Sequence, residues 1–125
     1  MREILFRGKR TDNKQWVEGF YALIGEENPS AYIIKSNGHR IRVAHKSISQ
    51  FTGLTDKNGK KIFEGDIMPV YEQGEEYYYK VVYNGDCFML AMLDSEQGSY
   101  PLSAKNAISE VIGNIHDNPE LLKGE

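Results

Sequence analysis

Cysteine, histidine and long apolar runs are scarce in this sequence, and each scarcity excludes a class of protein. Cys87 is the single cysteine among 125 residues, so an intrachain disulfide is impossible and a reducing compartment is favoured. No apolar run approaches the roughly 20 residues of a membrane-spanning helix. The first eight residues also lack the apolar core of a signal peptide. We therefore expect a cytoplasmic protein without a membrane partner.

Recognisable metal and catalytic motifs are missing as well. The three histidines have no second ligand at metal-binding spacing; they are His39, His45 and His116. Asp56 begins a segment that looks like a calcium loop, but such a loop needs glycine at its sixth position and an acid at its twelfth. Those positions hold Lys61 and Ile67, so a polar hairpin tip is expected instead. We expect no metal, no cofactor and no enzymatic activity.

Glu64 and Asp66 are the one pair of carboxylates with a spacing that could serve acid–base chemistry. On a strand both would share a face, and paired carboxylates can act together if their pKa values are driven apart. Gly65 between them favours a turn in which Asp66 bonds the backbone. A structural role is therefore the preferred interpretation.

The charge distribution is strongly uneven along the chain. Residues 1–61 contain twelve Lys and Arg against six Asp and Glu, whereas residues 62–125 contain three against twelve. Such asymmetry is typical of a basic nucleic-acid-binding face beside an acidic lobe. It is also typical of opposite faces that attract one another in a homo-oligomer. A third interpretation is that the two halves are solvated lobes whose charges differ by chance, without any functional role.

Turn and strand patterns predict a mainly β fold with little α structure. Alternating or β-rich stretches predict strands over residues 4–7, 16–24, 31–35, 39–44, 66–71, 77–83, 87–93 and 110–116. Asn37-Gly38 and Asn84-Gly85 are strong hairpin signals, and Pro69 indicates an edge position. Residues 16–24 carry apolar side chains on both faces, which predicts a mostly buried strand.

Gly65-Asp66 leads into an apolar strand, as the opening of small SH3-like barrels often does. We therefore expect an N-terminal β-hairpin subdomain over residues 1–49 and an SH3-like barrel subdomain over residues 50–125, packed as one unit. The barrel itself is expected over about residues 52–116. Asn118 and Pro119 predict a short C-terminal helical turn after it.

Three longer motifs stand in order along the chain. They are REILFRGKR at residues 2–10, FTGLTDKNGKKIFEGDI at residues 51–67 and VIGNIHDNPELL at residues 111–122. Together they resemble the YopX-like family of bacteriophage and prophage proteins. The resemblance implies a small, mainly β, phage-encoded protein of the bacterial host cytoplasm, and it carries over no catalytic residues.

Basic and aromatic side chains supply the candidate contact residues. Arg40 and Arg42 should project from one strand face, where they could contact nucleic acid or a partner. The lysines at the tip of the predicted hairpin are further candidates, namely Lys57, Lys60 and Lys61. Tyr77 and Tyr79 share a face and could stack bases, but the acidic residues before them would repel phosphate. Core packing or a subunit interface is therefore preferred for this pair.

These features favour a non-enzymatic interaction or assembly module of a phage that forms homo-oligomers. The alternative is a nucleic-acid-binding accessory protein that uses a basic N-terminal face. A sequence pI of about 5.6 weighs against the alternative, because domains that bind nucleic acid are usually basic.

Overall fold

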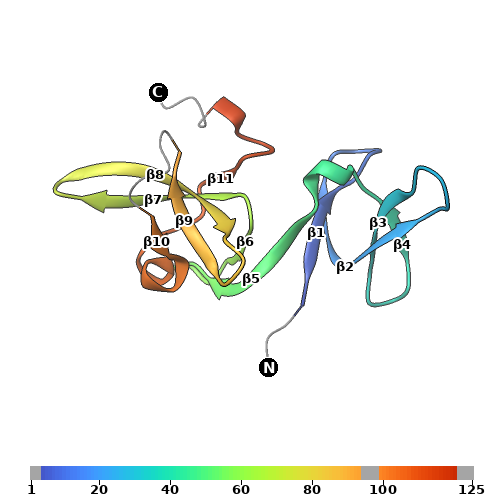
Figure 1. The fold of residues 1–125 in the computed structure, drawn as a ribbon, viewed down its shortest axis with the longest axis horizontal. Helices are drawn as coiled ribbons and strands as arrows, with labels where there is room; N and C mark the ends of the chain where they lie inside the picture. The colour runs from blue at the N-terminus through green and yellow to red at the C-terminus, as the bar shows by residue number, and fades with distance from the viewer. Residues whose placement is uncertain (1–3, 94–98, 121–125) are drawn as a thin grey trace. The chain divides into compact units, whose positions relative to one another are not determined.

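The computed structural model describes residues 4–93 and 99–120 and confirms a mainly β fold (Figure 1). The chain divides into two compact units, Met1–Phe51 and Thr52–Glu125. In the described part of the chain, no helix has the length and apolar character needed to cross a membrane. The expected packing of the chain as one unit stays a prediction.

The first unit is built on an antiparallel sheet with the order β4-β3-β2-β1, to which the start of β5 adds. Its strands are β1 (Phe6–Lys9), β2 (Trp16–Ile24), β3 (Ser30–Ile34), β4 (Arg40–Arg42) and β5 (Ser49–Thr55), with the short 3₁₀ helix η1 (His45–Ser47) between the last two. The hairpin predicted at Asn37-Gly38 is confirmed. Gly38 has a φ of 85°, a value that glycine adopts without strain.

One face of this sheet carries the core of the first unit. Ala31, Ile33 and Val43 are buried there, and partly buried apolar side chains pack against them. Gly8 is required at this point, because a Cβ atom on it would lie 2.9 Å from two side-chain carbons of Val43. One face of the sheet is therefore covered by the hydrophobic core of the first unit.

The second unit holds a five-stranded antiparallel sheet with the order β10-β9-β8-β7-β11. Its strands are β7 (Asp66–Glu72), β8 (Glu75–Tyr83), β9 (Phe88–Met92), β10 (Tyr100–Pro101) and β11 (Gly113–Asn114). The end of β5 pairs with β6 (Lys61–Phe63), and two short 3₁₀ helices follow β10, η2 (Leu102–Ala104) and η3 (Asn106–Ile108). The hairpin predicted at Asn84-Gly85 joins β8 to β9. Pairings among the described strands do not close a barrel, so the SH3-like barrel stays a prediction.

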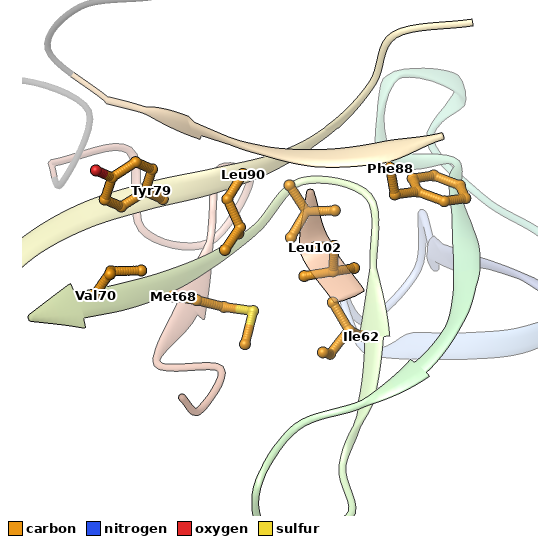
Figure 2. Close-up of a cluster of buried hydrophobic side chains, with 8 residues drawn as sticks. Ile62, Met68, Val70, Tyr79, Phe88, Leu90 and Leu102 are labelled. Atoms are coloured by element: carbon orange, nitrogen blue, oxygen red, sulfur yellow. The ribbon is translucent and has the colours of Figure 1, made fainter. Parts of the chain in front are cut away.

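The core of the second unit is larger than that of the first. Figure 2 shows its buried side chains gathered in one cluster; they are Ile62, Met68, Val70, Tyr79, Val81, Phe88, Leu90 and Leu102. They come from β6, β7, β8, β9 and η2. Burying one such large apolar side chain is worth about 1.5–3 kcal/mol, so this cluster holds elements that are far apart in the sequence.

The two acidic turn residues act as backbone acceptors, which the sequence predicted for Asp66. Asp56 is 5% exposed and accepts hydrogen bonds from the backbone N–H groups of Asn58, Lys60 and Val111 at 2.9–3.0 Å. Burial opposes its charged form, but these three donors outweigh burial and lower the pKa of Asp56. Asp66 is fully buried and accepts a hydrogen bond from the N–H of Phe63 at 2.8 Å. Both residues are therefore structural.

The predicted closing strand over residues 110–116 is wrong in length, since β11 contains only Gly113 and Asn114. The Asn114 side chain accepts hydrogen bonds from the N–H groups of His116 and Asp117, both at 2.9 Å. This side-chain turn replaces the ladder and ends the strand. The helical turn predicted after Asn118 runs into residues 121–125, which lie outside the described residues.

Candidate nucleic-acid interface

The sheet of the first unit presents its second face to solvent. Side chains alternate between faces along a strand, and directly paired residues share a face. The register pairs Lys9 with Trp16, Ala22 with Tyr32 and Ile34 with Arg40. We call this surface the open face, and it comprises Arg7, Lys9, Trp16, Glu18, Phe20, Ala22, Tyr32, Ile34, Arg40 and Arg42.

The open face is unusually rich in large apolar side chains. An antiparallel sheet with one face in the core normally carries polar residues on the other. Here Phe20 is 61% exposed, and Trp16, Tyr32 and Ile34 are half-buried. Phe20 and Ile34 also line a shallow hollow that Ile4 helps to form. An exposed apolar patch of this kind indicates a binding surface.

Cations lie over the aromatic rings of the same face. The Cζ atom of Arg40 is 5.8 Å from the ring centroid of Tyr32, and that of Arg7 is 4.5 Å from the centroid of Trp16. The Nζ atom of Lys9 lies 5.9 Å from the same Trp16 ring. These distances suit cation–π attraction. Arg7 is buried, so it supports Trp16 from within the sheet, whereas Arg40 is exposed.

A cleft of about 220 Å³ adjoins the end of the open face, between β4 and the turn after β1. It is lined by Arg10, Thr11, Asp12, His39, Arg40, Ile41 and Arg42. Arg10 donates two hydrogen bonds to Asp12, at 2.9 and 2.8 Å, and these bonds lower the pKa of Asp12. The charge of Arg10 is thus compensated locally. In the described part of the chain, Arg40 and Arg42 form no ion pair, so both are available to an anionic ligand.

The other predicted site residues lie in the second unit. Lys57, Lys60 and Lys61 are exposed on and beside the turn between β5 and β6, so the three belong to the second unit and are not part of the open face. Tyr79 is fully buried in the core, where burial and a hydrogen bond to Glu72 raise its pKa. Tyr77 is half-buried and donates a hydrogen bond to Glu75 at 2.7 Å.

Sequence reasoning missed the aromatic part of the open face. The alternation of Trp16 and Phe20 along one side of β2 was visible, but the strand was expected to be mostly buried. That expectation is wrong, because Phe20, Leu23 and Ile24 are exposed by 61%, 50% and 37%. The basic side chains of β4 were visible too, and only the pairing of β2 with β3 and of β3 with β4 brings the two groups together.

No group of three or more metal-ligating side chains occurs among residues 4–93 and 99–120. The chemistry available on the open face is therefore that of rings, apolar side chains, cations and the single carboxylate of Glu18. These groups can stack, bury apolar surface and bind anions. They do not form a set of nucleophile, base and acid.

Comparisons with known proteins agree with the fold. A family model described as YopX protein matches residues 5–123. The crystal structure of protein EF1440 from Enterococcus faecalis is similar, with a TM-score of 0.58 and 28% sequence identity. The similarity covers 98% of this chain and 99% of that one. No curated protein matches the chain.

Proposed function

The chain belongs to the YopX protein family, and from that premise we propose that it is a non-enzymatic protein whose first unit binds single-stranded nucleic acid on the open face. One observation carries the proposal. The open face brings exposed or half-buried rings together with Arg40 and Arg42, which form no ion pair in the described part of the chain, on the solvent side of a single sheet.

The rings of Trp16, Phe20 and Tyr32 would stack on unpaired bases. Base–aromatic stacking tolerates any sequence, because every base has a π-face. A four-stranded sheet with two or three aromatic residues accommodates about two or three bases. Lys9, Arg40 and Arg42 would contact the phosphates beside them.

The charge of the first unit supports this assignment. Residues 1–51 contain nine Lys and Arg against five Asp and Glu, whereas residues 52–125 contain six against thirteen. The acidic pI of the whole chain therefore reflects the second unit, and the unit that carries the open face is basic. We propose a single strand and not a duplex, because the rings of the open face can stack only on unpaired bases.

A homo-oligomeric assembly module is the second candidate function. Exposed apolar side chains in the second unit favour it, since Tyr71 and Ile108 are 71% and 69% exposed and line one hollow with Pro69. We also propose a phage or prophage origin, a location in the bacterial cytoplasm and an SH3-like barrel in the second unit, in line with the family resemblance.

The test is a fluorescence-anisotropy titration of labelled single- and double-stranded oligonucleotides with wild type and Phe20→Ala. Phe20 is so exposed that the change should leave stability within about 0.5 kcal/mol. Loss of one stacking ring should weaken single-strand binding by about 1–3 kcal/mol, or roughly 5- to 150-fold.

Leu23→Ala is the matched control, because Leu23 lies on the same strand and is 50% exposed, but on the opposite face. Binding by Leu23→Ala should equal that of wild type. Equal losses in the two variants, or no binding of single strands by wild type, would refute the proposed site.

A further inference from the structure

The hairpin of β7 and β8 forms an acidic projection of the second unit. Figure 1 shows this hairpin extending past the neighbouring strands of its sheet. Gln73 and Gly74 form its two-residue turn with φ values of 52° and 82°, which is the type I′ geometry that joins strands tightly. The register places Glu72 directly opposite Glu75. From residue 62 to residue 79 the chain contains no Lys or Arg.

We define the acidic tip as Tyr71, Glu72, Glu75 and Glu76. Tyr71 is 71% exposed, and a hydrogen bond with Glu76 raises its pKa. The hydrogen bond from Tyr79 lowers the pKa of Glu72, so this carboxylate stays charged. Like charges placed directly opposite each other destabilise a strand pair. Lys105 of the same unit already favours the charged form of Glu72, and a cationic partner would relieve the remaining repulsion.

The open face has the complementary composition, since Lys9, Arg40 and Arg42 lie beside its rings. We propose that the acidic tip of one copy docks on the open face of a second copy. Carboxylates of the tip would meet the cations that phosphates are proposed to contact, and Tyr71 would lie against the rings. The inference rests on the proposed function in one respect: docking and nucleic-acid binding use the same surface and exclude each other.

The contact joins two different surfaces, so it is heterologous, and a dimer keeps one free tip on one copy and one free open face on the other. Association should therefore extend beyond a dimer as concentration rises. It should also weaken with salt, because both surfaces are solvent-exposed and charged.

The experiment is light scattering of the full chain at low and high salt, with two neutralising variants. Arg40→Gln plus Arg42→Gln removes the cations, and Glu75→Gln plus Glu76→Gln removes the carboxylates. Wild type should exceed monomer mass at low salt and return to monomer at high salt. Each variant should be monomeric alone, and an equimolar mixture should form a dimer and nothing larger, since only one intact tip and one intact open face remain.

Glu26→Gln plus Glu27→Gln is the control, because this exposed acidic pair lies in the loop between β2 and β3. It should associate like wild type. Self-association of either neutralised variant alone would overturn the proposal, and so would a mixture that stays monomeric.

Adding a short single-stranded oligonucleotide to associated wild type separates the two hypotheses. Displacement of the complex to a monomer with bound oligonucleotide supports both. A wild type that binds oligonucleotide but never self-associates overturns the docking proposal and leaves the proposed function intact. If wild type self-associates but binds no oligonucleotide, the proposed function is refuted, and so is the proposed competition between the two ligands of the open face.

Discussion

The salt dependence of binding offers a quantitative prediction for the cations of the open face. Three of them, Lys9, Arg40 and Arg42, are the proposed phosphate contacts. For a single strand, each neutralised phosphate contributes about −0.7 to the slope of log affinity against log salt, so wild type should show a slope of about −2. Between about 50 mM and about 200 mM salt, its affinity should fall roughly 20-fold.

Arg40→Gln plus Arg42→Gln leaves one of the three cations in place. Its slope should fall to about −0.7, so the same change in salt should cost only about threefold in affinity. The fold should persist, because both side chains are exposed and neither takes part in an ion pair in the described structure. Anisotropy titrations of a labelled oligothymidylate at several salt concentrations give both slopes.

Lys57→Gln plus Lys60→Gln is the matched control, since it removes the same charge from two exposed positions of the second unit. Its slope should equal that of wild type. If the slope of log affinity against log salt became shallower in this control but was unchanged in the Arg40 and Arg42 variant, the site would lie at the β5–β6 turn instead. A wild type whose affinity is independent of salt would refute the reasoning altogether.

Two further predictions concern stability. Asp56→Asn should lower the free energy of unfolding by about 1–3 kcal/mol, because it weakens a buried acceptor of three backbone hydrogen bonds; chemical denaturation measures this, and an unchanged midpoint would contradict it. Since the pKa of Asp56 is lower in the folded chain, the wild-type advantage should be complete above the ordinary pKa of 3.8 and should vanish as pH falls further below it. Gly8→Ala should cost about 1–3 kcal/mol, because the new methyl group would lie 2.9 Å from Val43; a melting temperature equal to that of wild type would show that the core can yield.

Local chemistry explains which parts of the fold were predictable from the sequence. Asn37-Gly38 and Asn84-Gly85 specify tight turns through their own backbone preferences, so the hairpins around them follow from a few residues. Asp66 likewise bonds a backbone N–H only three residues away. By contrast, β11 ends early because the side-chain oxygen of Asn114 accepts hydrogen bonds from the backbone N–H groups of His116 and Asp117. Strand propensity does not predict such a turn.

The candidate site was harder to predict because it depends on which side of a strand is covered. Both sides of β2 are apolar, so periodicity alone could not tell that Tyr21 packs in the core while Phe20 faces solvent. The register of β2, β3 and β4 then decides that Tyr32 and Arg42 share a face. Tyr79 shows the converse, since core packing was one of the two roles preferred for it from the sequence, and its side chain is fully buried.

Trp16 permits the most direct test of the central claim, because it is the single tryptophan in the chain and lies on the open face. Its fluorescence should be quenched saturably by a single-stranded oligonucleotide, with the same midpoint as the anisotropy titration. Quenching should be weaker at every oligonucleotide concentration in Arg40→Gln plus Arg42→Gln. Binding that is clear by anisotropy but leaves the fluorescence of Trp16 unchanged would place the nucleic acid elsewhere and contradict the account.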